Sequence, residues 1–176
     1  MDDAALVKGT LEGCQEDFEV LVERYQKMIY AFVYRQLQDP DMTGDLVQAT
    51  FVQAYTHLAG YRGEATFKTW LHEIALNQCR SFFRSRRSHQ TVPIDELPEE
   101  VLKETRHDPE RALETIKLGR LVGRLPLRQR TVVNLRVFSD LPFAEIARLE
   151  GITENSAKVN YHHAITRLKQ WLIPEK

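Results

Sequence analysis

The sequence predicts an all-α protein made of two small helical domains joined by an acidic linker. Apolar residues recur every three or four positions over most of the chain, which is the spacing of a buried helix face, and no stretch of the 176 residues shows strand-like alternation. Around residues 88–108 this pattern lapses, and prolines stand among acidic residues. We therefore expect domains over residues 15–88 and 112–173, with the linker over residues 89–111.

Three helices are expected in the first domain. One apolar stripe covers residues 18–33 and stops before a proline, and a second covers residues 47–58 and ends at a glycine. Thr66 has the side chain of an N-cap residue and precedes a third stripe over residues 67–78. Three such helices with short connections can pack as a bundle.

The second domain is predicted to begin with two helices. Asp108 is the expected N-cap of the first, because Pro109 follows it in the first turn, where proline is well tolerated. Pro126 interrupts this helix, and a short helix is expected over residues 129–137.

Residues 142–172 have the form of a helix-turn-helix motif. Gly151 can adopt the positive φ of its tight turn, and Thr153 is the expected N-cap of its second helix. A buried side with Ala157 and Leu168 is expected on this second helix. The opposite side offers groups that can reach base edges in a major groove: Ser156, Lys158, Val159, Asn160, His162, His163 and Arg167. An ordinary helical hairpin with a solvated polar face is the alternative.

Charge is unevenly distributed along the chain. The formal net charge of −1 argues, by itself, against nucleic-acid binding. However, residues 112–176 carry eleven lysines and arginines against six acidic residues, whereas residues 89–111 carry three against seven. The near-neutral total therefore conceals a basic C-terminal module.

No feature predicts secretion, a membrane span, a metal site or catalysis. The acidic N-terminus lacks the basic start of a signal peptide, and no apolar run reaches the roughly 20 residues of a membrane span. Cys14 and Cys79 have neither disulfide nor zinc spacing, and the adjacent His162 and His163 diverge too far around a helix to chelate together. We expect a cytoplasmic protein that is not an enzyme and uses no cofactor, metal or small-molecule substrate.

Residues 61–87 combine a glycine-containing loop, an amphipathic helix and a group of arginines. Such interleaving of aromatic, amide and cationic side chains is typical of surfaces that hold a single nucleic-acid strand. Phe67 and Trp70 lie on the inward stripe, so core packing is the simpler role for both. Tyr61 and Arg62 precede the helix and are left to contact a base.

The helix within this stretch carries further groups suited to a nucleic acid. Asn77 lies off the apolar stripe and can both donate to and accept from a base edge. The arginines near the helix end exceed what compensation of the helix dipole requires and indicate phosphate contacts. These are Arg80, Arg84, Arg86 and Arg87.

The order of these parts resembles the extracytoplasmic-function class of bacterial RNA polymerase sigma factors, and the resemblance runs from Phe18 to Leu172. In the first module, FEVLVERYQ, DLVQATFVQAY and YRGEATFKTWLHEIALN resemble region two of that family. In the second, LPLRQRTVVNLR and FAEIARLEGIT resemble region four. The resemblance implies an alternative sigma factor that binds core RNA polymerase, recognises the minus-ten and minus-thirty-five promoter elements and promotes DNA melting.

The resemblance also implies roles for individual residues. The helix that docks on the polymerase clamp is matched by Asp45, Leu46, Gln48 and Phe51. The loop that captures a flipped base of the minus-ten element is matched by Tyr61, Arg62, Gly63, Glu64 and Ala65. Further minus-ten contacts are expected from Lys68, Asn77, Arg80 and Arg84. The minus-thirty-five element is expected to meet Ser156, Lys158, Val159, Asn160, His162, His163 and Arg167.

The implied partners are core polymerase (its clamp helices and flap), promoter DNA and an anti-sigma factor. In this family the anti-sigma factor is often membrane-bound, which would hold the chain at the inner membrane surface. The acidic linker resembles the segment threaded through the polymerase interior. The chain departs from the family pattern at Ala49, where an acid is common, and at Pro142, where a serine often caps the helix. Fewer arginines follow Lys158, so the family's usual minus-thirty-five sequence is not transferred to this chain.

Two other readings stay open on the residues alone. One is a stand-alone helix-turn-helix regulator that binds duplex DNA without polymerase. The other is an interaction protein or anti-sigma-like adaptor whose helices only cover partner helices. Residues 61–87 discriminate between these readings and a sigma factor, because neither alternative needs a base-capturing loop followed by a basic helix.

Overall fold

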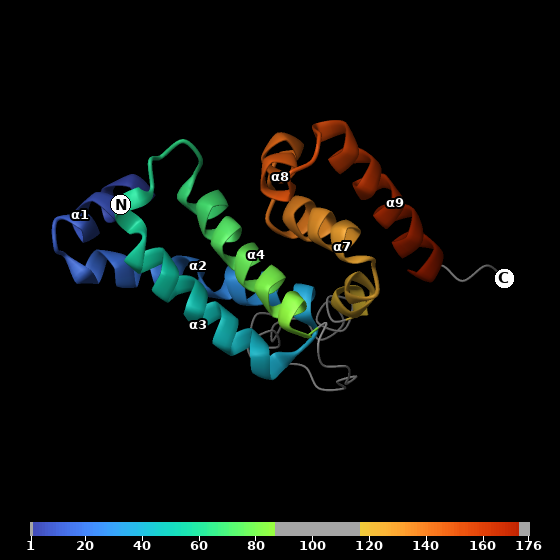
Figure 1. Ribbon diagram of the computed structural model, residues 1–176, viewed down its shortest axis with the longest axis horizontal. Coiled ribbons are helices and arrows are strands. Elements are labelled where there is room, and N and C mark those ends of the chain that lie inside the picture. Colours follow the sequence, from blue (N-terminus) through green and yellow to red (C-terminus); the bar gives the residue numbers. More distant parts are fainter. Residues whose placement is uncertain (1, 87–116, 173–176) are drawn as a thin grey trace, which may run out of the picture. The chain divides into compact units, whose positions relative to one another are not determined.

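The computed structural model describes residues 2–86 and 117–172, and within them every regular element is a helix (Figure 1). The described residues form two compact units: unit 1 holds residues 2–33 and 41–86, and unit 2 holds residues 34–40 and 117–172. The prediction of an all-α chain with two small helical domains is confirmed. The linker and the predicted cap at Asp108 lie outside the described residues.

Unit 1 is built from three long helices and a short N-terminal one. Its elements are α1 (Asp3–Leu11), α2 (Gln15–Leu37) up to residue 33, α3 (Pro40–Thr56) from residue 41, the 3-10 turn η1 (Leu58–Gly60) and α4 (Phe67–Arg86). Side-chain contacts join the long helices: the rings of Phe18 in α2 and Tyr55 in α3 lie 5.0 Å apart. Gln78 of α4 donates a hydrogen bond of 2.7 Å to Gln53 of α3. The sequence analysis predicted no helix over the residues of α1.

The core of unit 1 is mostly apolar and also buries the polar side chains of Thr43, Thr50, Thr69 and His72. Leu21, Phe32 and Leu71 are fully buried, and burying each such side chain contributes about 1.5–3 kcal/mol relative to leaving it in water. His72 is buried among them, with Nδ1 2.8 Å from the carbonyl oxygen of Lys68 and its ring edge-on to Phe32. The imidazole is therefore bonded within its own helix and contributes to packing.

The start of α4 is capped as predicted. The backbone N–H of Thr69 donates to Oγ1 of Thr66 over 3.1 Å, which satisfies one of the free amides of the first helical turn. Arg84 and Arg86 stand in the last turn, where cations oppose the helix dipole. Arg87, the last of the predicted basic group, lies outside the described residues.

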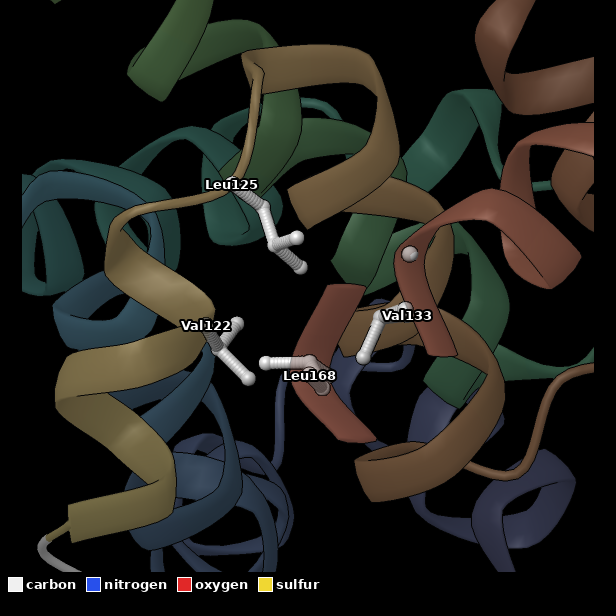
Figure 2. Close-up of a cluster of buried hydrophobic side chains, with 5 residues drawn as sticks. Val122, Leu125, Val133 and Leu168 are labelled. Atoms are coloured by element: carbon white, nitrogen blue, oxygen red, sulfur yellow. The ribbon is translucent and has the colours of Figure 1, made fainter. Parts of the chain in front are cut away.

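Unit 2 packs its helices around one apolar cluster. Its elements are a helix over residues 117–123, α7 (Leu127–Val133), a π-helical turn η2 (Asn134–Phe138), α8 (Phe143–Glu150) and α9 (Glu154–Leu172). Val122, Leu125, Val133 and Leu168 converge in the centre of the cluster (Figure 2). The helix predicted over residues 129–137 is thus α7 followed by a π-turn.

The helix-turn-helix geometry of α8 and α9 is confirmed. Gly151 has a φ of 63°, and the N–H of Ile152 donates to the carbonyl of Ala147 over 3.0 Å, which closes the end of α8. The N–H of Ser156 donates to Oγ1 of Thr153 over 3.1 Å, so this threonine is the N-cap of α9.

None of the helices in residues 2–86 and 117–172 is long and apolar enough to cross a membrane. Over the same residues, no group of three or more histidine, cysteine, aspartate or glutamate side chains is arranged to hold a metal ion.

Candidate nucleic-acid interface

The loop between η1 and α4 is closed by one of its own side chains. Tyr61 donates from its hydroxyl to the carbonyl oxygen of Ala65 over 2.7 Å, and its N–H donates to Leu58 over 3.0 Å. Gly63 takes a φ of 72°, which residues with a Cβ rarely adopt. The loop therefore has a defined turn, with Arg62, Gly63 and Glu64 exposed at its tip.

An aromatic cluster lies beneath this loop, and we define it as Tyr25, Tyr61, Phe67 and Trp70. The ring centroid of Phe67 lies 5.7 Å from that of Tyr25, 5.8 Å from that of Tyr61 and 5.7 Å from that of Trp70. Tyr61 and Trp70 are 5.2 Å apart. These separations are those of favourable aromatic pairs.

The sequence predicts that Phe67 and Trp70 pack in the core and that Tyr61 is left to contact a base, and the cluster modifies this prediction. Phe67 is buried as predicted, whereas Trp70 is only half-buried. Tyr61 is also half-buried and is packed against both, so its ring forms the floor of the loop. Burial raises the pKa of the Tyr61 hydroxyl, and the nearby carboxylate of Asp3 raises it further.

The face of α4 that continues from the loop is polar and basic. Asn77 is exposed and accepts a hydrogen bond of 3.2 Å from Arg80. Arg84 is exposed one turn further on, and at 100° per residue it lies on the same side of the helix as Asn77. Lys68 is half-buried and lies on the opposite side of α4 from Asn77. The structure thus brings Asn77, Arg80 and Arg84 together, and leaves Lys68 apart from them near the loop.

The predicted clamp-docking residues on α3 fall into two groups. Asp45 and Gln48 are exposed, whereas Leu46 and Phe51 are 9% and 8% exposed and pack inward. The exposed face continues instead through two residues that the sequence reasoning did not select, Val52 at 60% and Tyr55 at 50% exposed. The spacing of i, i+3, i+7 and i+10 from Asp45 was the signal for this stripe. We call these four residues the α3 stripe: Asp45, Gln48, Val52 and Tyr55.

The predicted recognition surface on α9 is mostly exposed. Its exposed members are Lys158, Val159, His162, His163 and Arg167. Ser156 is half-buried, and so is Asn160, whose Nδ2 donates to the carbonyl of Ser156 over 2.8 Å. Asn155 and Thr166 are exposed on the same side and were missed, although helical spacing from Val159 and His162 indicates both.

Lys158 of the α9 surface has an ion-pair partner within the helix itself. The ammonium of Lys158 is 2.7 Å from a carboxylate oxygen of Glu154, and both side chains are about half exposed. An exposed pair of this kind contributes roughly 0.3–0.5 kcal/mol to the helix. The opposite side of α9 is buried through Ala157, Ala164 and Leu168.

Comparisons with known proteins match both units. The description Sigma-70 region 2 matches residues 21–89, and Sigma-70, region 4 matches residues 115–168. The ECF RNA polymerase sigma-E factor of Escherichia coli (strain K12) is 31% identical over 160 residues, which cover 85% of this chain and 83% of the relative. The chain belongs to the ECF class of the sigma-70 family.

Further relatives agree with this family assignment. RNA polymerase sigma-H factor of Pseudomonas aeruginosa is 32% identical to this sigma factor over 156 residues, covering 82% of this chain and 80% of the relative. In one solved structure, CnrH is in complex with the cytosolic domain of CnrY; its TM-score is 0.72 at 22% identity, over 97% of this chain and 96% of that one.

A second solved structure is the sigma factor RpoE in complex with the anti-sigma factor NepR from Bartonella quintana. Its TM-score is 0.76 at 20% identity, over 92% of this chain and 99% of that one. Both structural likenesses show the fold. Sigma factors are non-catalytic transcription initiation factors, and this chain is an alternative sigma factor. A stand-alone regulator is not favoured, because regions 2 and 4 both match, in the family's order.

Proposed function

We propose that this sigma factor divides promoter recognition between its two units. In unit 1, the α3 stripe docks on core polymerase, while the loop over residues 61–65 and the basic face of α4 hold the melted minus-ten strand. In unit 2, α9 enters the major groove at the minus-thirty-five element. The observation that carries this proposal is the loop itself, which is closed by Tyr61 over the aromatic cluster and followed by Asn77, Arg80 and Arg84.

The free-energy cost of melting implies that the complex with core polymerase, and not the chain alone, opens the duplex. Opening a duplex costs about 1.4 kcal/mol per base-pair step in lost stacking. One base held against an aromatic surface recovers about 1–3 kcal/mol, so a single captured base offsets only one or two broken steps. Contacts from core polymerase must supply the rest. The sigma factor then selects where opening occurs by binding the open strand better than the closed duplex.

The minus-ten loop has a specific geometry under this proposal. Tyr61 and Trp70 form the floor on which the base rests, and the tip residues Arg62, Gly63 and Glu64 form its rim. Asn77 reads a neighbouring base edge, since an amide can donate and accept at once. Arg80 and Arg84 contact phosphates. Leu46 and Phe51, which pack inward, support the α3 stripe from behind.

We also propose that the chain works in the cytoplasm, has no catalytic role and is held inactive by an anti-sigma factor. In one structural relative the sigma factor RpoE is in complex with the anti-sigma factor NepR, and in the other CnrH is in complex with the cytosolic domain of CnrY, which makes this mode of control the natural one to test here. The α3 stripe is a candidate contact, because it exposes Val52 and Tyr55 on an otherwise polar face. Attachment of that partner to the inner membrane would hold the chain at the membrane surface.

The experiment is run-off transcription with core polymerase of the source organism on a library with randomised minus-ten and minus-thirty-five elements. We expect transcripts that start downstream of one enriched pair of elements, and only when both proteins are present. The chain alone should bind the enriched duplex weakly. Failure to co-purify with core polymerase, or transcripts without enrichment at either element, would refute the proposed function.

A further inference from the structure

The N-terminal helix α1 is fixed in place at both ends. Asp2 caps it by accepting from the N–H of Ala5 over 2.8 Å. At the other end the N–H of Cys14 donates to the carbonyl of Gly9 over 2.9 Å, across Gly13 at a φ of 103°. A Cβ on Gly9 would lie 1.8 Å from a carboxylate oxygen of Asp17 at the start of α2. This short helix is therefore built to pack closely against its neighbour.

The buried side of α1 lies against the turn that leads into the minus-ten loop. Leu6 is 1% exposed, and Val7 is also buried. α1 is in contact with η1, whose Leu58 is buried and accepts the hydrogen bond from the backbone of Tyr61. A displacement of α1 would thus remove the packing under the first residue of the loop.

Asp3 connects α1 to the aromatic cluster. One carboxylate oxygen accepts from Arg24, with 2.5 Å between Oδ1 and Nη1, and the other accepts from the hydroxyl of Tyr25. Tyr25 packs on Phe67, and Phe67 packs on Tyr61, the residue that closes the loop. A continuous set of contacts therefore runs from Asp3 to Ala65. Burial, together with the Asp3 carboxylate, raises the pKa of Tyr25 to about 12. The same two causes, burial first, raise the pKa of Tyr61.

We propose that α1 belongs to the strand-capturing machinery, with Asp3 as a positioning residue that sets the shape of the minus-ten loop through Tyr25 and the aromatic cluster. The inference rests on the function proposed above for residues 61–65. Asp3 need not touch DNA. It holds the Tyr25 hydroxyl, so the ring of Phe67 stays where Tyr61 and Trp70 can form one floor.

The test compares Asp3→Ala and Asp3→Asn with Lys8→Ala. Lys8 lies on the same helix, where its side chain is 76% exposed and pairs only with Glu12 at 66% exposure among the ion pairs of the described residues. Asp3→Asn keeps the side-chain shape and one hydrogen-bond acceptor, so it serves as a second variant in case Asp3→Ala fails to fold. Two single-stranded probes are used: the minus-ten strand found by run-off mapping, and the same strand lacking the base that the loop captures.

The expected result is a selective loss. Asp3→Ala should bind the intact strand about tenfold more weakly, since the hydrogen bond from Tyr25 and the ion pair are both lost, and the abasic strand with nearly unchanged affinity. Asp3→Asn should show a smaller loss in the same direction, and Lys8→Ala none. Tyr25→Phe should reproduce most of the effect, and the double variant should be little worse than either single one. Equal losses on both probes, or no loss, would overturn the proposal.

A readout without DNA separates this inference from the proposed function. In a Trp171→Phe background the emission of Trp70 reports the aromatic cluster directly. Asp3→Ala should shift that emission to the red and increase its quenching by acrylamide, while Lys8→Ala leaves both unchanged. If the wild-type chain fails to bind the intact strand, the proposed function fails. The Trp70 emission then decides whether α1 sets the loop, and an unchanged spectrum in Asp3→Ala would refute it.

Discussion

Replacing Asn77 with alanine isolates the minus-ten contact from folding. Asn77 is exposed and accepts a hydrogen bond of 3.2 Å from Arg80, which water can replace. Alanine is the better helix former by roughly 0.5 kcal/mol, so Asn77→Ala should leave the free energy of unfolding unchanged or slightly higher. Any loss of function then reflects lost recognition.

The size of that loss follows from the chemistry of the amide. A side-chain amide that pairs with a base edge contributes about 1–3 kcal/mol of discrimination. A loss of about 1.4 kcal/mol, in the lower half of that range, corresponds to roughly a tenfold fall in the fraction of open complex. Closed-complex binding should hardly change, because an intact duplex does not present that base edge to α4.

The assay compares permanganate footprinting, which reports unpaired thymines, with gel shift of the same promoter under conditions that keep the duplex closed. Gln26→Ala is the matched control, since it removes an exposed amide from α2. We expect the Asn77 variant to lose footprint reactivity and keep the shift, and the control to keep both. Equal losses in the two assays, or a lower midpoint in urea unfolding, would refute the reasoning.

Three further predictions concern the other unit, the core and pH. His163→Arg adds a cation to the exposed side of α9, so the slope of log affinity against log salt for duplex minus-thirty-five DNA should steepen by about 0.9; an unchanged slope would place His163 away from the backbone. Phe67→Ala should lower the free energy of unfolding in urea by about 3–5 kcal/mol, because the ring is buried in the aromatic cluster, and a loss under 1 kcal/mol would contradict that packing. Burial raises the pKa of Tyr25 and of Cys79 to about 12 each, above the values of 10.0 and 9.0 expected without burial. Both groups therefore keep their protons to a higher pH in the folded state than in the unfolded state. The free energy of unfolding should fall as pH rises from about 9 to about 12. Cys79→Ala should make that fall shallower in unfolding measured across alkaline pH, and an identical slope would count against burial of the thiol.

Local signals were sufficient to predict the caps and the turn motif. Thr66 and Thr153 each accept the backbone hydrogen bond expected of an N-cap, and Gly151 adopts the left-handed conformation of the turn. These features depend on residues within three or four positions of one another, so the sequence contains what is needed to recognise them.

Features that depend on packing from elsewhere were not predictable in the same way. In α1 the buried Leu6 and Val7 are adjacent, following two alanines, and therefore give no helical stripe. The packing of Tyr61 on the cluster depends on Tyr25, which lies on another helix. The inward direction of Phe51, by contrast, follows from the apolar stripe predicted over residues 47–58.

The ion pair between Lys158 and Glu154 bears on how the protein searches a chromosome. A phosphate that approaches Lys158 must compete with a carboxylate already 2.7 Å away. Random duplex offers only such phosphates, and affinity for random duplex governs how long a protein lingers between its targets. If α9 contacts DNA as proposed, the resident carboxylate shortens visits to the wrong sites, while a correct site can compensate through contacts with bases. Glu154 would in this way favour fast sampling over tight holding.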